Sequence, residues 1–188
     1  DGIVFTHEHK DHIAGLDDIR AFNYKQQSAI DVYADQRVQA ALKREFHYIF
    51  QEFKYPGIPQ LDLHTIGTEP FNIGDINFIP IEVLHYKLPV LGFRLNDFTY
   101  ITDAKTVSEQ EKEKIKGTRI LVINALQKQE HISHFTFDEA IAFAQEIGAE
   151  TTYLTHISHR LGKHADISRE LPAGIELAYD GLQLQVTD

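Results

Sequence analysis

The sequence predicts an α/β protein in which strands and helices alternate along the 188 residues of the chain. Short runs rich in β-branched residues alternate with segments of helical periodicity, which is typical of layered α/β domains. The chain has no low-complexity tract, repeat or long linker, so we interpret residues 1–188 as one domain. Its hydrophobic content of 43% is enough for a core, and no apolar stretch approaches the length of a membrane span.

Seven strands are predicted from apolar, β-branched runs bounded by polar or turn residues. They cover residues 3–6, 31–34, 77–83, 92–95, 99–102, 120–123 and 152–155. Asn96 and Asp97 are the expected turn of a hairpin. A second hairpin is expected at the C-terminus, where residues 175–178 and 182–186 flank Asp180-Gly181, a strong turn signal.

Two helices are predicted by capping boxes, in which a hydroxyl and a carboxylate satisfy free N–H groups at the helix start. These boxes are Ser108 with Glu111 and Thr136 with Glu139. In the second helix Phe137, Ala140, Ile141, Ala144 and Ile147 fall on one face, and Gly148 occupies the C-cap position. Another helix is expected from residue 35 to about residue 46.

Five aromatic residues follow that helix within a short stretch. They are Phe46, Tyr48, Phe50, Phe53 and Tyr55. Such a cluster could line a pocket or form a lid, but aromatic side chains are more often buried by packing. We therefore expect this cluster to belong to the core.

The charge and the absence of cysteine restrict the function. A formal net charge of −10 repels phosphate backbones, so a small molecule is favoured over a nucleic acid as the substrate. With no cysteine, any metal must be held by imidazole and carboxylate groups. The composition is compatible with the cytoplasm, and we expect no membrane partner.

The main chemical signal is the segment Thr6-His7-Glu8-His9-Lys10-Asp11-His12, which directly follows an apolar strand. Crowded imidazoles repel one another once protonated, whereas a divalent metal keeps them neutral and uses their lone pairs. In a loop that leaves a strand, His7 and His9 can project the same way, while Asp11 and His12 turn toward a second position at a helix start. The pattern predicts two adjacent metal sites; the alternatives are a solvated polar loop and a structural site for one metal.

Further candidate ligands lie just beyond later strands, where an α/β sheet presents its functional groups. They are His85, Asp103 and His156. Each one alone is more often a cap than a ligand, so the prediction depends on their joint recurrence at the ends of three apolar strands.

The ordered set of His7, His9, Asp11 and His12, followed by His85, Asp103 and His156, resembles the ligand set of the metallo-β-lactamase superfamily. Two segments, 88–93 and 101–104, are similar to the branch that contains the phosphoribosyl cyclic phosphodiesterase of phosphonate breakdown. Segments 133–140 and 154–159 resemble that branch as well. The resemblance spans most of the chain.

This resemblance implies an αββα sandwich that binds two divalent ions. One metal would be held by His7, His9 and His85, and the other by Asp11, His12 and His156, with Asp103 bridging. Zinc and manganese suit such ligands, and iron does too. Family members carry strands ahead of the first motif, so we expect part of the N-terminal sheet to be missing from residues 1–188. A bare edge strand would allow a homodimer.

The function implied is metal-dependent hydrolysis, with a small, cyclic phosphodiester as the expected substrate. The catalytic residues proposed on this basis are Asp11 and His134; His134 matches a substrate-contacting or proton-donating histidine of the branch, although it could also be a solvated helix-entry residue. A thioester or lactone hydrolase could use the same metals, and a member without catalysis could keep them. His9 argues against a redox di-iron enzyme, which usually has a carboxylate there.

A local positive segment follows His156 in this acidic chain. It contains His159, Arg160, Lys163 and His164. The segment could recognise phosphate, but a solvated loop explains it equally well. We interpret Glu8, Asp17 and Asp18 as surface, helix-start or ligand-orienting acids.

Overall fold

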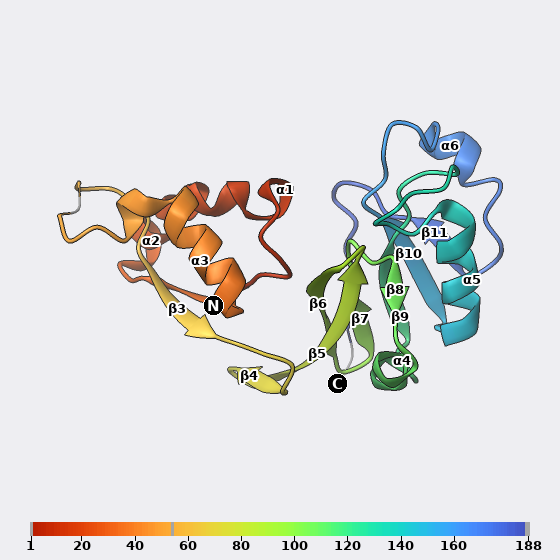
Figure 1. Cartoon of the computed structure of the whole chain (residues 1–188), viewed down its shortest axis with the longest axis horizontal. Helices are drawn as coiled ribbons and strands as arrows, with labels where there is room; N and C mark the ends of the chain where they lie inside the picture. Colours follow the sequence, from red (N-terminus) through yellow and green to blue (C-terminus); the bar gives the residue numbers. More distant parts are fainter. Residues whose placement is uncertain (1, 54, 187–188) are drawn as a thin grey trace. The chain divides into compact units, whose positions relative to one another are not determined.

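A computed structural model of the chain describes residues 2–53 and 55–186, and it divides into two compact units, Asp1–Ile73 and Gly74–Asp188 (Figure 1). Each unit is a sheet with helices packed against it, so the predicted mixed α/β class is confirmed. No helix among the described residues is both long and apolar enough to cross a membrane.

The first unit contains a sheet in the order β1-β2-β3, with all strands parallel. Its elements are β1 (Gly2–Val4), α1 (Lys10–Ile13), η1 (Ala14–Ile19), α2 (Arg20–Gln26), β2 (Ile30–Ala34), α3 (Gln36–Glu45), η2 (His47–Ile49), β3 (Leu61–Thr65) and β4 (Phe71–Ile73). The predicted helix after residue 35 is confirmed as α3, whose first turn is capped by the Asp35 carboxylate at 2.7 Å from Val38 N. Val38 and Leu42 on its apolar face pack with Val32 of β2 in the core of this unit.

The second unit contains a larger sheet in the order β11-β10-β9-β7-β6-β5, and β8 pairs with β5. Its elements are β5 (Ile76–His85), β6 (Leu88–Leu95), β7 (Phe98–Tyr100), β8 (Thr106–Val107), α4 (Glu109–Ile115), β9 (Ile120–Asn124), α5 (Phe137–Ile147), β10 (Thr151–Thr155), α6 (His164–Ile167) and β11 (Ile175–Leu177). Strands β7, β9, β10 and β11 are parallel, whereas β5, β6 and β7 are joined as antiparallel neighbours. The C-terminal ends of β5, β7, β9 and β10 therefore lie at one edge of the sheet.

Helix α5 covers this sheet beside β9 (Figure 1). Its apolar face, with Phe137, Ala140 and Phe143, packs against Leu121 and Ile123 of β9 in the core. The capping box is confirmed, with Thr136 and Glu139 bonded reciprocally, and Gly148 ends the helix in a left-handed conformation. The predicted capping box at Ser108, before α4, is only half formed. Ser108 Oγ accepts from Glu111 N, but the Glu111 carboxylate accepts from Glu82 N and pairs with Lys114.

The C-terminal hairpin prediction is wrong. The turn at Asp180-Gly181 forms, with Leu182 N donating to Tyr179 O at 3.1 Å. However, β11 pairs in parallel with β10, and no strand follows the turn among the described residues up to 186. The Gln185 carbonyl accepts a hydrogen bond from the Arg119 guanidinium instead of from a neighbouring strand. The hairpin at Asn96-Asp97 is confirmed between β6 and β7.

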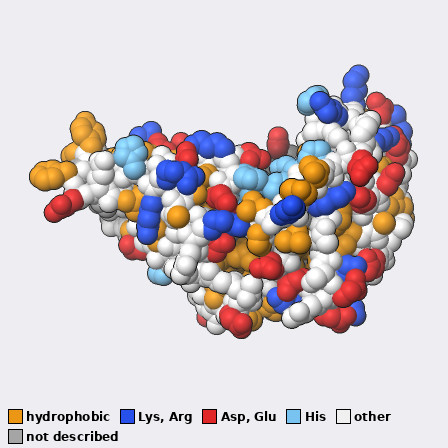
Figure 2. All heavy atoms as spheres, in the orientation of Figure 1, with side chains coloured by type: hydrophobic (Ala, Val, Ile, Leu, Met, Phe, Trp, Pro, Cys, Tyr) orange, Lys and Arg blue, Asp and Glu red, His pale blue; other side chains and the backbone are white. Residues whose placement is uncertain are grey.

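The aromatic stretch after α3 is buried only in its first part. Phe46 is buried, and Tyr48 and Phe50 pack against the core of the first unit. Phe53 and Tyr55 are 95% and 82% exposed, so the prediction that the whole cluster is core is wrong. Hydrophobic side chains project from this part of the first unit in Figure 2.

Candidate functional site

The first group of candidate residues lies between β1 and α1 of the first unit. His7 is fully buried, and its ring lies 4.7 Å from the ring of His9 and 4.1 Å from that of His12, measured between centroids. His12 Nε2 lies 3.3 Å from Asp11 Oδ2. Asp11 and His12 belong to the first turn of α1, as the sequence predicts, because the helix begins at Lys10. The four predicted ligands of this segment therefore form one cluster.

The loop that carries this cluster is fixed by its neighbours. The Glu8 carboxylate accepts a hydrogen bond from Arg37 of α3 at 2.9 Å, so Glu8 connects the loop to the helix. Thr6 Oγ1 lies 3.1 Å from His7 Nδ1, which orients the ring of His7. Asp17 is also engaged, because it accepts a hydrogen bond from the Tyr48 hydroxyl. Burial, together with this contact to a carboxylate, raises the pKa of Tyr48 to about 12.

The second group lies at the sheet edge of the second unit where several strands end. His85 is the last residue of β5, Asp103 follows β7, and His156 directly follows β10. His156 Nε2 lies 3.3 Å from Asp103 Oδ1. The predicted positions at the ends of three strands thus do converge within this unit, because β5, β7 and β10 run in the same direction.

His134 belongs to this second group. A group of three potential metal ligands consists of Asp103, His134 and His156. Each offers one carboxylate oxygen or ring nitrogen, and these three atoms lie within 4.8 Å of one another, a spacing suited to a metal ion. The ring of His134 lies 4.4 Å from that of His85 and 4.9 Å from that of His156. His134 precedes the capped start of α5, and the capping box at Thr136 fixes the backbone that presents it.

Two residues of the group have an unusual backbone conformation. Asp103 and His156 have φ values of 57° and 53°, in the left-handed region that few residues other than glycine adopt. Such conformations cost free energy and concentrate at functional sites. Their occurrence at both members of a carboxylate–imidazole pair supports a functional role for this edge.

His134 has an environment that keeps its imidazole neutral. Burial lowers its pKa to about 4, and the nearby rings of His85, His156 and His131 lower it as well, against the opposing effect of Asp103. Its Nδ1 atom is buried 3.9 Å from Asp103 Oδ2 and has no hydrogen-bond partner within residues 2–53 and 55–186. A buried ring nitrogen without a hydrogen bond is costly unless a ligand uses it.

Three further residues build this group, and no role was predicted for them from the sequence. Asn124, at the end of β9, is buried and holds the Ala104 backbone through Ala104 N at 2.7 Å and Ala104 O at 3.0 Å. The Ser133 carbonyl lies 2.8 Å from His85 Nδ1 and orients that ring, and His131 lies 5.0 Å from the ring of His134. The available signal in the sequence was that Asn124 is the one polar residue at the end of the otherwise apolar run 120–124.

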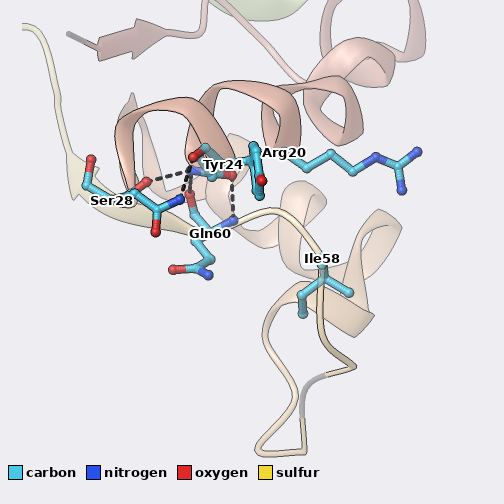
Figure 3. A pocket seen from close by; sticks show the side chains of 8 residues that line it. Arg20, Tyr24, Ser28, Ile58 and Gln60 are labelled. Atoms are coloured by element: carbon cyan, nitrogen blue, oxygen red, sulfur yellow. Dashed lines mark hydrogen bonds between the residues drawn. The ribbon is translucent and has the colours of Figure 1, made fainter.

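A cavity of about 320 Å³ in the first unit is not a candidate active site (Figure 3). Its lining is Arg20, Asn23, Tyr24, Gln27, Ser28, Gly57, Ile58 and Gln60, with no carboxylate or imidazole. The Asn23 side chain is already bonded to Ser28 O, Gln60 O and Gln60 N. These bonds give Asn23 a structural role, in which it ties α2 to the approach of β3.

The donor set fits divalent metal ions. Clustered imidazoles and carboxylates are ligands for zinc, manganese and iron, and metal-binding histidines are usually oriented by a hydrogen bond to the other ring nitrogen. His85 and His7 both have such a contact, to Ser133 O and Thr6 Oγ1. Each group by itself offers at least three ligand side chains.

Comparisons with known proteins find a matching family and similar solved structures. Residues 1–157 match the family described as a beta-lactamase superfamily domain. A crystal structure of a new diphosphatase from the PhnP family superimposes with a TM-score of 0.90 at 36% identity, over 100% of this chain and 72% of that one. The metallo-β-lactamase fold protein YhfI from Bacillus subtilis has a TM-score of 0.76 at 18% identity, over 97% and 76% of the two chains.

A curated relative carries a different name. The octanoyltransferase of Porphyromonas gingivalis is 37% identical over 185 residues. This match covers 97% of the chain but only 37% of the relative, so the chain spans little more than a third of that protein's length.

Proposed function

Because the chain belongs to the metallo-β-lactamase superfamily of hydrolases, we propose that it is a metal-dependent phosphodiesterase that acts on a small phosphodiester or diphosphate ester. The observation that carries the proposal is the cluster in which His134, with a ring nitrogen not used in a hydrogen bond, adjoins the Asp103–His156 pair. A hydrolytic site needs such a group beside its metal ligands to meet the leaving-group oxygen.

The proposed ligands come from both groups. His7, His9 and His85 would hold one ion, Asp11, His12 and His156 the other, and Asp103 would bridge them, as the order of these residues in the family implies. When bound, two divalent ions acidify water and neutralise charge on substrate oxygens. Zinc or manganese would serve, and the donor chemistry also suits iron.

The protein's own residues orient these ligands. Ser133 O at 2.8 Å and Thr6 Oγ1 at 3.1 Å fix the rings of His85 and His7, so their remaining nitrogens point in defined directions. The Thr102 hydroxyl donates to Asp103 Oδ1 at 2.7 Å and restrains the bridging carboxylate. Pre-oriented ligands bind and position a substrate without the entropy cost of ordering them at each turnover.

We propose that His134 contacts the leaving-group oxygen. In the free protein its imidazole is neutral, because its pKa is about 4, and a neutral imidazole still has one N–H donor. A phosphate bound beside it favours the protonated form, since opposite charges raise the pKa of an imidazole. The protonated ring can then pass a proton to the departing alkoxide.

A second candidate function is hydrolysis of an acyl ester or thioester. It is favoured by the name of the 37% identical relative, which transfers an octanoyl group. The match covers only 37% of that relative, so the name can refer to the part that this chain does not match. The same proposed ligands would serve an acyl substrate, and a substrate test separates the two functions.

The deciding experiment compares bis-p-nitrophenyl phosphate, a ribose cyclic phosphate and an octanoyl thioester as substrates of protein loaded with zinc or manganese. We expect metal-dependent hydrolysis of the two phosphodiesters. The Asp11→Ala, His12→Ala variant should lose it, and His134→Asn should lower kcat by about a hundredfold or more. His47→Ala, at an exposed histidine outside the proposed set, is the matched control and should leave kcat unchanged.

The outcomes distinguish the hypotheses. Hydrolysis of the thioester alone would replace the phosphodiesterase proposal with the acyl one. Folded protein that binds two metals but hydrolyses none of the three substrates would contradict both and indicate a member of the family without catalysis.

A further inference from the structure

A separate cavity of about 200 Å³ lies in the second unit beside His156. It is lined by Thr155, His156, Ile157, Ala178, Tyr179 and Asp180. Two segments build it, the end of β10 and the turn after β11, and Ala178 N joins them by donating to Leu154 O at 2.9 Å. The proposed metal ligands account for only one of its lining residues.

The size of the cavity limits what can occupy it. Sites for drug-sized ligands measure roughly 300–1,000 Å³, and a water molecule occupies about 30 Å³. A space of about 200 Å³ therefore suits one ring system and not a whole extended ligand.

The walls indicate the chemistry of that ring. Tyr179 is 59% exposed, so much of this cavity-lining side chain is accessible to a ligand. The His164 ring meets it edge-on at 6.5 Å between centroids. Ile157 adds a second apolar wall, and Asp180 adds an exposed carboxylate. A carboxylate repels a phosphate but accepts hydrogen bonds from N–H groups, which favours an uncharged ring with donors over a phosphate in this cavity.

Two positively charged residues follow the lining residue His156 in the sequence. Arg160 and Lys163 are exposed, and neither forms an ion pair within the described part of the chain. In the sequence they lie between His156, which lines the cavity, and His164, whose ring contacts that of Tyr179. Local positive charge attracts a phosphate ester to an otherwise acidic protein.

From these contacts we infer that the cavity is a binding subsite for the nucleobase of a nucleotide phosphodiester, with Tyr179 as the stacking surface and Asp180 as the hydrogen-bond acceptor. The inference rests on the proposed function and names its substrate class. Every nucleobase has a π face, and stacking on an aromatic side chain is a common means of binding one. The substrate's phosphate would then lie toward His156, outside the part of the cavity that Asp180 borders.

The test uses two cyclic phosphodiesters that differ only in the base. They are adenosine 2′,3′-cyclic phosphate and methyl ribofuranoside 2′,3′-cyclic phosphate, hydrolysed by the full chain loaded with zinc or manganese. Tyr179→Ala should raise KM about tenfold for the adenosine compound, with kcat unchanged, because stacking is lost. KM for the methyl compound should stay within about twofold. Tyr179→Phe keeps the ring and should restore the adenosine KM.

Phe22→Ala is the matched control, since Phe22 is 59% exposed like Tyr179 but lies on α2 of the first unit. It should change neither KM. An equal change for both substrates in Tyr179→Ala, or no change for either, would overturn the subsite.

Binding of adenosine is measured in parallel by saturation-transfer NMR, which does not need turnover. If the wild-type protein hydrolyses neither diester, the proposed phosphodiesterase function fails on its own. Saturation transfer to the adenine protons that disappears in Tyr179→Ala would still support the subsite, and its absence in the wild-type protein would contradict it.

Discussion

At the residue scale, the backbone around Asp103 is fixed by an amide from another strand. Asn124 is fully buried at the end of β9 and bonds both Ala104 N and Ala104 O. Ala104 directly follows Asp103, whose φ of 57° is unfavourable without external support. We therefore interpret Asn124 as the residue that holds Asp103 in its left-handed conformation.

We predict that Asn124→Ala weakens metal binding as well as the fold. The substitution leaves Ala104 N buried without its acceptor, whereas Ala104 O keeps the bond from Phe135 N, so the free energy of unfolding should fall by about 1–3 kcal/mol. Because Asp103 loses its support, metal affinity should fall by about 10–100-fold. Chemical denaturation and a competitive metal-chelator titration measure the two effects.

The control is Ile123→Val, one residue earlier in the same buried strand. It removes one methylene and should cost about 1 kcal/mol without changing metal affinity. Equal affinity in the two variants would show that Asn124 supports the fold alone.

The candidate residues differ in how visible they are in the sequence. His7, His9, Asp11 and His12 could be predicted because a dense local cluster of imidazoles has few structural explanations. Asn124 could not, since its role depends on a partner 20 residues away across two strands. His131 lies only three residues before His134, but the sequence alone does not show that the two rings approach to 5.0 Å.

At the element scale, the start of α5 connects the helix to the candidate site. Thr136 Oγ1 accepts from Glu139 N at 3.2 Å, and Thr136 N donates to the Glu139 carboxylate at 2.8 Å. The same carboxylate accepts from Lys105 Nζ at 2.8 Å, close to Asp103 in the chain. The cap thus fixes both the segment that presents His134 and the loop after Asp103.

We predict that Thr136→Ala lowers the free energy of unfolding by about 1 kcal/mol, because one N–H of the first turn of α5 loses its acceptor. Hydrogen exchange should become faster at the Glu139 amide while the amides of β9 keep their protection. Thr136→Ser retains the hydroxyl and should behave like the wild type. Unchanged exchange at Glu139 in the alanine variant would contradict the role of the cap.

Helices and strands could be predicted from the sequence where they have a long apolar pattern or a full set of capping residues. Helix α5 has both a cap and an apolar face, and the sequence predicts it with its C-cap. Strand β3 was missed because Asp62 and His64 alternate with only two apolar residues, and the His64–Asp31 contact at 2.7 Å depends on β2. The C-terminal hairpin failed because β11 already has a parallel partner in β10, which local turn residues do not reveal.

At the scale of the whole molecule, the proposed ligands are divided between two units with separate cores. The cores are centred on Val32, Val38 and Leu42 in one unit and on Leu121, Ile123 and Leu154 in the other. His7, His9, Asp11 and His12 belong to the first unit, and His85, Asp103 and His156 to the second. Metal binding by the proposed ligand set therefore stabilises both units.

We predict that zinc raises the midpoint of thermal unfolding and that a chelator reverses the rise. A ligand bound only by the native state adds about 2.7 kcal/mol at a hundred times its Kd. His7→Ala and His85→Ala should each reduce the rise, because each removes one ligand of the same proposed ion, His7 from the first unit and His85 from the second. His47→Ala should retain the rise. If His85→Ala keeps the full rise while His7→Ala abolishes it, the metal is bound by the first unit alone and the shared ligand set is wrong. Differential scanning calorimetry, with the bound metal quantified in each variant, separates these outcomes, since a lost ligand lowers the stoichiometry or the affinity as well as the midpoint.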